Sequence, residues 1–289
     1  MRAIHPRMAS VDSLLELLDL ERLDRDLFRA PNTEETRGGR MFGGQVAGQA
    51  LRAATLTVDV DHFPHSLHGY FLRPGDPSIP IVLSVDRIRD GRSFTTRRVV
   101  AIQQGEAIFS LSSSFHKSEE GGEYQLPIAA DVPDPDDEEL AGSSSPFGRF
   151  GAMSPLDIRE LGPTPPDERG IYESTRRVWI RTSGPVPDDP ALRACVITYI
   201  SDMGVVMAAR VPVTGQYGFP GMGMGMAASL DHSVWFHRDI RPDEWMLMNL
   251  RSISNTGARG LVQGTIHSRH GALGVAIAQE GLVRTDPPG

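Results

Sequence analysis

The sequence has little cysteine, no long apolar run and no leader-like N-terminus. Of its 289 residues only Cys195 is a cysteine, so no internal disulfide framework can form and a reducing compartment is expected. No apolar run approaches the length of a membrane span, and no cationic start is followed by an apolar core and a small-residue cleavage site. The C-terminal stretch 284–289 is not a peroxisomal address. We therefore expect a cytoplasmic protein without a membrane partner.

Positive charge is also scarce, with 29 Lys and Arg against 37 Asp and Glu and a net charge of −8. A protein that binds nucleic-acid phosphates generally needs a basic surface, so we expect no nucleic-acid partner. The balance still permits an anionic small molecule, which needs only a local basic pocket. One locally basic stretch, 87–98, has two interpretations: a solvated strand edge, or a surface that meets the phosphates of an anionic ligand.

Familiar catalytic and metal-binding patterns are missing as well. No Gly-x-Ser-x-Gly elbow is present, which disfavours a covalent serine hydrolase. Asp231 and His232 are adjacent, so on a strand they point to opposite faces and fit a Ser-His-Asp triad poorly. A metal site from Asp231, His232 and His237 lacks a recognisable ligand spacing, and a structural role suits these histidines better. We therefore predict no metal and no cofactor.

What the sequence does contain is a long internal repeat. The pattern Tyr70-Phe71-x-Arg73 returns as Trp235-Phe236-x-Arg238, an offset of 165 residues (236 − 71). The turn pair Gln104-Gly105 returns as His270-Gly271, an offset of 166 (271 − 105). A nearly constant offset predicts an internal duplication with units the size of a small domain. The alternative is a chance similarity between two β-rich stretches.

Each unit is predicted to be a helix followed by antiparallel strands, which makes the chain an α+β protein. A helix rich in small residues is predicted over 41–54, and a longer, apolar one from 187 to 207. An additional amphipathic helix begins at Ser10 or Ser13 and is expected to pack on a sheet face. Strands are predicted at 65–72, 79–89, 92–103, 106–116, 176–181, 229–238, 244–254, 258–268 and 272–284.

Between the units lies a polar, proline-rich stretch. Its acidic run, 134–139, is predicted to be solvated and to have no further role. We therefore divide the chain into an N-terminal domain at 10–117, a linker at 118–170 and a C-terminal domain at 171–286.

Three polar residues occupy places in the second unit where apolar residues would be favoured. Asp202 falls within an otherwise apolar helix, and Ser229 and Gln279 fall on strands. A buried carboxylate is costly unless it is paired or functional. Each residue alone is most simply an ordinary hydrogen-bonded polar group. In the first unit Ser113 stands in the place of Gln279, His65 lies near that of Ser229, and Asp202 has no clear counterpart, as expected if one copy lost its function.

The motifs together resemble the acyl-CoA thioesterase II family, the double-hotdog thioesterases. The resemblance spans about Leu14 to Arg284, apart from the linker. It includes Ser229-Leu-Asp-His-Ser233 and Gln279-Glu-Gly281. The remaining matched segments are 42–46, 65–76, 89–94, 97–99, 178–179 and 235–238.

The resemblance implies a double hotdog, in which two tandem helix-wrapped antiparallel sheets join into one continuous sheet. It implies an acyl-CoA substrate, a homo-oligomer (dimer or tetramer), and a catalytic Asp, Thr or Ser, and Gln in the second unit. The matching residues here are Asp202, Ser229 and Gln279. Many members carry Thr where this chain has Ser229, which retains the hydroxyl but is less restricted in rotamer.

The implied chemistry is hydrolysis of acyl-CoA to free acid and CoA, without a metal or a covalent intermediate. Asp202 can act as general base, while Ser229 and Gln279 hold the attacking water. Backbone N–H groups of Gly43 and Gly44, at a helix start, can stabilise the oxyanion. The apolar run 222–226 can line an adaptable site. The alternatives are a hotdog enoyl-CoA hydratase and a non-catalytic acyl-CoA-binding protein.

Overall fold

The computed structural model describes residues 10–32, 41–129, 131–141, 155–215 and 226–284. The first half of the chain contains α1 (Val11–Leu18), β1 (Glu21–Asp24), β2 (Leu27–Ala30), α2 (Gly43–Thr55), β3 (His62–Phe71), β4 (Ile81–Asp90), β5 (Phe94–Gln103) and β6 (Glu106–Lys117). After a connecting segment with α3 (Glu138–Ala141), the second half contains β7 (Leu156–Gly162), β8 (Arg176–Thr182), α4 (Pro190–Ser201), α5 (Val205–Thr214), β9 (Ala227–Ser229), β10 (Asp231–Phe236), β11 (Met246–Thr256), β12 (Arg259–Ser268) and β13 (Leu273–Val283).

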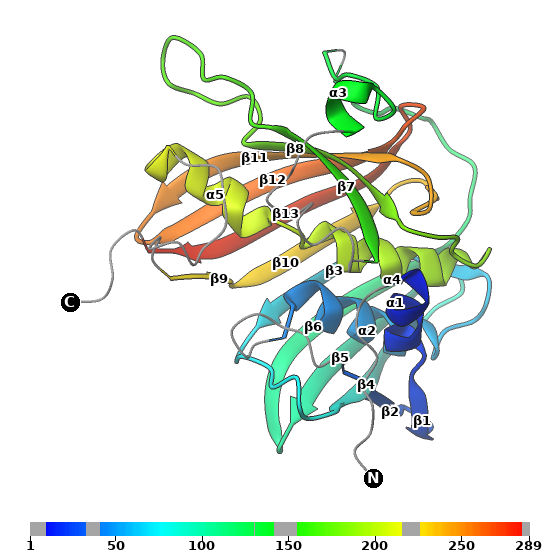
Figure 1. Cartoon of the computed structure of the whole chain (residues 1–289). Coiled ribbons are helices and arrows are strands. Elements are labelled where there is room, and N and C mark those ends of the chain that lie inside the picture. Colours follow the sequence, from blue (N-terminus) through cyan, green and yellow to red (C-terminus); the bar gives the residue numbers. More distant parts are fainter. Residues whose placement is uncertain (1–9, 33–40, 130, 142–154, 216–225, 285–289) are drawn as a thin grey trace.

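All the described strands belong to one 13-stranded sheet that passes through both halves (Figure 1). Its order is β1-β2-β4-β5-β6-β3-β10-β13-β12-β11-β8-β7, and β9 pairs with β13. Every pairing is antiparallel, and α2, α4 and α5 pack on one face of the sheet, whereas Leu140 of α3 packs on the opposite face beside Trp179. Two helix-wrapped sheets joined into one confirm the predicted α+β double-hotdog architecture.

The two halves meet at the β3–β10 pair, where the duplication is visible in the register. Tyr70 pairs with Asp231, and Ser66 pairs with Trp235. The repeat offset of 165 makes Ser66 the counterpart of Asp231 (231 − 66) and Tyr70 the counterpart of Trp235 (235 − 70). Counterparts therefore exchange places across the pair, and a local two-fold axis runs through the centre of the sheet.

Helix α2 packs antiparallel against α4 because its glycines allow the two backbones to come close. A Cβ on Gly44 would clash with the carbonyl oxygen of Tyr199, and one on Gly48 would lie 3.0 Å from that of Cys195. Helix α1 lies beside both helices rather than on the sheet, which corrects the predicted packing. Its N-cap is Ser10, whose Oγ accepts the Ser13 N–H.

The long second helix differs from its prediction in two ways. It is interrupted at Asp202, where a turn leads to Gly204 (φ +79°) before α5 begins. The segment Pro190–Thr214 is also, by its 25 residues and mean hydropathy of 1.5, long and apolar enough to cross a membrane, so the expectation of no such run was wrong. In this fold 83% of its apolar window is buried, as in the core helix of a globular domain.

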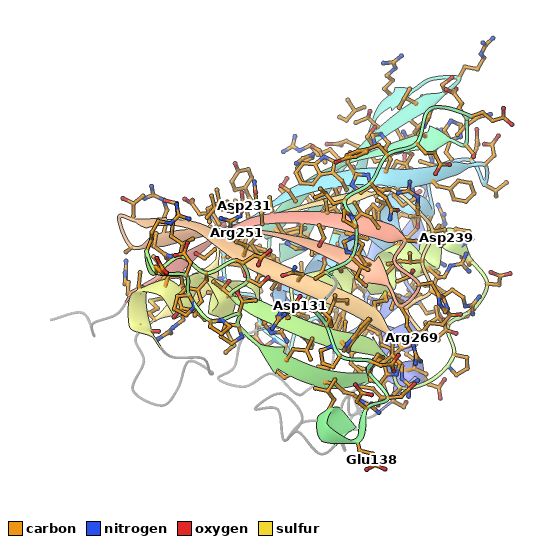
Figure 2. The ribbon with its side chains drawn as sticks, turned by 90° about the horizontal axis from the view of Figure 1, so that it is seen from above. Asp131, Glu138, Asp231, Asp239, Arg251 and Arg269 are labelled. Atoms are coloured by element: carbon orange, nitrogen blue, oxygen red, sulfur yellow. The ribbon has the colours of Figure 1, made fainter. Side chains whose placement is uncertain are left out.

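The connecting segment is more ordered than predicted. Strand β7 extends the second half's sheet into the stretch expected to be linker, with Leu156 buried. The acidic run is not simply solvated, because Arg269 donates to Asp134 and Asp136 at 2.8 and 2.7 Å. Figure 2 shows Arg269 at the end of the sheet nearest α3. Trp179 donates its indole N–H to the Pro133 carbonyl at 2.9 Å, so the segment also covers the outer face of β8.

Candidate active site

Asp202 lies where α4 ends, and its side chain points into the protein. The residue is only 6% exposed. It is the C-cap of α4, with φ −82° and ψ −5°, and its N–H reaches the Ile200 carbonyl. Since the last helical turn stops at this point, the carboxylate is aimed away from α4 and toward the neighbouring strands and α2.

Ser229 and Gln279 approach Asp202 from two paired strands. Gln279 Nε2 lies 2.9 Å from Asp202 Oδ1 and 2.8 Å from Ser229 Oγ, and Ser229 Oγ lies 3.3 Å from the same Oδ1. Ser229 is opposite Gly281, whereas Ser233 is opposite Ala278, so the strand is irregular around Leu230. This irregularity lets Ser229 and Gln279 face one carboxylate. The three predicted residues are therefore brought together.

The start of α2, in the other half of the chain, also lies against the Asp202 carboxylate. The Gly44 N–H favours the ionised form of the Asp202 carboxyl and so acts to lower its pKa. A Cβ on Gly43 would lie 2.7 Å from Asp202 Oδ2, so only glycine leaves room for the carboxylate there. Free N–H groups and the positive end of the helix dipole favour negative charge at this position.

Two influences act on the pKa of Asp202 in opposite directions. Burial raises the pKa of Asp202 above its ordinary 3.8, while His232, Gln279, the Gly44 N–H and Ser229 act in the other direction. Burial likewise lowers the pKa of His232, against the influence of Asp202. A carboxylate with a raised pKa that is still held by donors is the form expected of a general base.

His232 is a member of the site that the sequence analysis left as a structural histidine. It is fully buried, and its Nε2 lies 2.8 Å from Ser201 Oγ, one residue before Asp202. Its Nδ1 and the Oε1 of Gln279 are both buried without a hydrogen-bond partner within standard distances. The sequence offered one signal, a histidine on the inward face of an alternating strand.

A cavity of about 380 Å³ opens beside the cluster and is bounded by both halves. Ser229 lines it, whereas Asp202 and Gln279 lie behind its wall. The other lining residues are mainly apolar: Met41, Gly43, Val46, Phe71–Gly75, Ile108, Phe109, Met226–Ala228 and Leu230. Of the predicted run 222–226, only Met226 is among the described residues. The volume and the apolar lining suit a small organic ligand.

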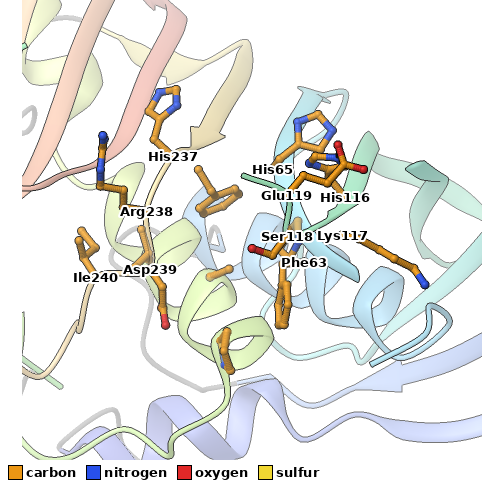
Figure 3. Close-up of a pocket in the computed structure, with 15 residues that line it drawn as sticks. Phe63, His65, His116, Lys117, Ser118, Glu119, His237, Arg238, Asp239 and Ile240 are labelled. Atoms are coloured by element: carbon orange, nitrogen blue, oxygen red, sulfur yellow. The ribbon is translucent and has the colours of Figure 1, made fainter. Parts of the chain in front are cut away.

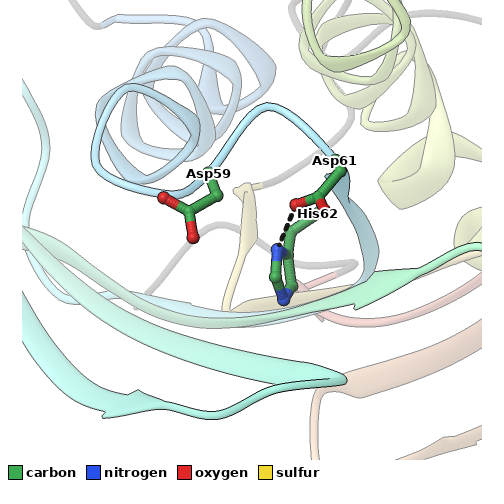
Figure 4. Close-up of side chains that lie close together, drawn as sticks. All are labelled: Asp59, Asp61 and His62. Carbon is green, nitrogen blue, oxygen red and sulfur yellow. Dashed lines mark hydrogen bonds and ion pairs between the residues drawn. The ribbon is translucent and has the colours of Figure 1, made fainter.

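The alternative constellations do not assemble. Asp231 Oδ1 accepts the Glu280 N–H at 2.6 Å on the opposite face from His232, and His237 lines a different cavity. Among the described residues one group of carboxylate and imidazole ligands lies close enough for a metal: Asp59, Asp61 and His62 (Figure 4). Lys117 already forms an ion pair with Asp61 at 2.6 Å, and these three residues are remote in sequence from Asp202, Ser229 and Gln279.

None of the residues in the basic stretch 87–98 lines the cavity beside the cluster. Arg97 is buried, donating to Thr57 and pairing with Asp90, and Arg87 donates to Asp26. The interpretation as a solvated strand edge was therefore wrong for Arg97, which is an internal cross-brace between β5 and the end of α2.

The fold and this cluster together define a double-hotdog protein with a carboxylate–hydroxyl–amide site. A family model for the acyl-CoA thioesterase N-terminal domain matches residues 32–116, and one for acyl-CoA thioesterase matches residues 166–282. The chain belongs to the acyl-CoA thioesterase family, the thioester hydrolases that the sequence resemblance predicted.

Relatives and solved structures agree with this assignment. The chain is 37% identical to acyl-coenzyme A thioesterase 8 of Mus musculus, covering 94% of this chain and 88% of that protein. It is 34% identical to acyl-CoA thioesterase 2 of Haemophilus influenzae, over 95% and 98%. The crystal structure of acyl-CoA thioesterase II TesB2 from Mycobacterium marinum matches with a TM-score of 0.78 and 41% identity, over 93% and 97%. A hot dog protein from Alicyclobacillus acidocaldarius shares the fold, with a TM-score of 0.74 at 21% identity.

Proposed function

We propose that this protein hydrolyses fatty acyl-CoA to free acid and CoA by general-base activation of water at Asp202. The observation that supports the proposal is the contact of Ser229 and Gln279 with one buried carboxylate, beside an apolar cavity. Asp202 takes a proton from a water as that water attacks the thioester carbonyl, and the thiolate of CoA leaves.

Ser229 and Gln279 hold the water in this proposal. A serine hydroxyl both donates and accepts hydrogen bonds, so Ser229 can hold the water, while the Gln279 amide donates to Asp202 Oδ1 and Ser229 Oγ, interacts with His232, and so fixes the groups around the water. Both side chains are held in place by their mutual contact, which keeps the water aligned with the carboxylate.

In this proposal, a backbone N–H group at the start of α2 stabilises the oxyanion. Because the Gly44 N–H already serves the Asp202 carboxylate, Gly43 is the better placed of the two predicted donors. Gly43 lines the cavity next to Ser229, so a thioester carbonyl in this cavity can reach its N–H. The acyl chain then extends along the apolar lining.

The test is thiol release from acyl-CoAs of graded chain length by wild type and Asp202→Asn. Loss of the general base should lower the rate about 10²–10⁴-fold, while the isosteric amide preserves the shape of the site. Glu280→Gln is the matched control, because it removes a neighbouring carboxylate that binds Arg259 away from the cluster.

Product analysis separates the alternatives. Hydration of an enoyl-CoA without thiol release would indicate a hydratase, and binding without turnover at any chain length would indicate a binding protein. An Asp202→Asn rate within a few-fold of wild type would refute the role given to Asp202.

A further inference from the structure

A second cavity, of about 460 Å³, lies at the opposite end of the β3–β10 pair from the first (Figure 3). Its floor is apolar, with Ala194 and Ile197 of α4 and the side chain of Ile240 buried beneath it. Its rim is polar: His65, His116, Lys117, Ser118, Glu119, His237, Arg238 and Asp239. Nothing in the hydrolytic cluster faces this cavity.

The second cavity is the two-fold counterpart of the first. Its lining segment 236–240 corresponds to 71–75 at an offset of 165 (236 − 71), and 63–65 corresponds to 228–230 at the same offset (228 − 63). The start of α4 closes one cavity as the start of α2 closes the other. The duplication therefore produced two equivalent cavities.

An arginine at the mouth has been retained in both copies with the same backbone anchor. Arg73 Nη1 donates to the Ala107 carbonyl at 2.8 Å, and Arg238 Nη1 donates to the Leu273 carbonyl at 3.4 Å. The backbone agrees, since the Arg73 and Arg238 N–H groups bond the counterpart carbonyls of Ile108 and Gly274. Each guanidinium also meets one exposed carboxylate, Glu106 or Glu123.

The hydrolytic groups, in contrast, are absent from the second cavity. The strand irregularity between Pro64 and Ser66 matches that around Leu230, which puts Pro64 in the place of Ser229 (229 − 64 = 165). Ser113 stands in the place of Gln279, and its hydroxyl donates to the Ser66 carbonyl. A proline and a satisfied serine cannot hold a water for attack.

We propose that this cavity is a non-catalytic binding site for an acyl chain with an anionic head group. The retained features are those that bind, an apolar floor and a mouth arginine, and the lost features are those that hydrolyse. Two molecules of this chemistry occur around an acyl-CoA hydrolase: the acyl-CoA itself and the free fatty acid.

The charges around the mouth identify Arg238 as the head-group contact. Lys117 is held by Asp61, and Asp239 is held by the buried Arg193. Arg238 meets only Glu123 among side-chain carboxylates in the described residues, at 3.2 Å, and that glutamate is 81% exposed. A ligand carboxylate or phosphate can displace so exposed a partner at little cost. Glu119, which pairs with His116, is the remaining acid on the rim and disfavours a second anionic group there.

The experiment measures binding stoichiometry on the full chain in an Asp202→Asn background, where ligand is not consumed. Titration calorimetry is run with dodecanoate, with the thioether S-dodecyl-CoA, and with CoA alone. We expect two acyl ligands per chain, and one after Arg238→Gln is added. The matched variant Arg73→Gln, at the other mouth, should weaken the remaining site and spare the one at Arg238.

The ligand series distinguishes the sources. A second equivalent with dodecanoate indicates a product site, and one with the thioether alone indicates a substrate site. A second equivalent with CoA alone would overturn the claim for an acyl chain. A single equivalent that Arg238→Gln leaves intact would overturn the proposal, whether or not Asp202 proves catalytic.

Photolabelling guards against misfolded variants. A dodecanoate carrying a diazirine near its chain end should label residues 190–197 or 236–240 in the unaltered protein, besides the first cavity. Labelling restricted to the lining of the first cavity would contradict the second site.

Discussion

The fold buries the Asp202 carboxylate, although its ionised form would be better solvated in water. Burial raises its pKa, and the partners that oppose this are the groups proposed to hold the water, together with His232 and the Gly44 N–H. A residue that is unfavourable for stability but surrounded by fixed donors is typical of a catalytic group. The sequence identified Asp202 by its apolar surroundings, whereas the contribution of α2 from the other half required the folded chain.

The pH dependence follows from the direction of this shift. Asp202 must be ionised to act as base, so kcat/KM should rise with pH along an acid limb whose pKa lies above 3.8. Stability should move oppositely, because a raised folded pKa makes the ionised form unfavourable, and stability is lost as pH rises from about 3.8 through the folded pKa.

Pre-steady-state or initial rates between pH 4 and 8 measure the limb, and thermal melts of Asp202→Asn at neutral pH measure the stability effect. The amide variant should melt higher than wild type. A limb at or below the ordinary carboxyl pKa, with an unchanged melting temperature, would contradict this account of the site.

The hydroxyl of Ser229 is the second residue-scale prediction. Ser229→Ala should lower kcat roughly 10- to 100-fold, since losing one hydrogen-bonding group beside a buried carboxylate costs about 1–3 kcal/mol. Ser229→Thr keeps the hydroxyl and should stay within a few-fold of wild type. Initial-rate kinetics on one acyl-CoA decide between them, and equal rates for the alanine and threonine variants would remove Ser229 from the mechanism.

At the scale of elements, the packing of α2 against α4 sets the position of the site. A Cβ on Gly44 would clash with the Tyr199 carbonyl, and the Gly44 N–H favours the ionised form of Asp202. The small-residue pattern of α2 was sufficient to predict close packing. The break between α4 and α5 was not predicted, because the local sequence around Asp202 continues the apolar helical pattern, and only Gly204 at φ +79° marks the turn.

Gly44→Ala should therefore lower both the free energy of unfolding and the rate of hydrolysis. The added methyl meets a backbone carbonyl that cannot move aside, and such overpacking typically costs about 1–3 kcal/mol. Urea unfolding measures the loss. Gly121→Ala is the control, because a Cβ there meets nothing within 4 Å. Equal stability of the two variants would show that the helices have room to separate.

At the scale of the whole molecule, one sheet joins the two halves, so we expect them to unfold together. All three tryptophans, Trp179, Trp235 and Trp245, belong to the second half. Leu83→Ala removes a fully buried side chain from β4 in the first half and should cost about 2–5 kcal/mol.

In a single cooperative transition, the midpoint reported by tryptophan fluorescence should fall with Leu83→Ala as far as the midpoint from circular dichroism. An unchanged fluorescence midpoint would mean that the halves unfold separately.

The general plan of the molecule was predictable because a repeat and a period-two pattern survive in the sequence. The seam was not, since nothing in the strand 65–72 says that it pairs with the strand near 231 rather than with an outer strand. The role of 118–141 was also hidden: its prolines and acids are typical of linkers, and its contacts with Trp179 and Arg269 depend on a partner far along the chain.

The apolar segment Pro190–Thr214 has a consequence for biosynthesis. A ribosome releases α4 and α5 before it has made β10 to β13. Helix α4 finds α2 already available, but α5 contacts chiefly β11, β12 and β13, which are synthesised last. During that interval the apolar side chains of α5 are exposed to water, and a nascent chain with this exposed surface is prone to aggregate. The last strands to be synthesised therefore protect the segment by covering it.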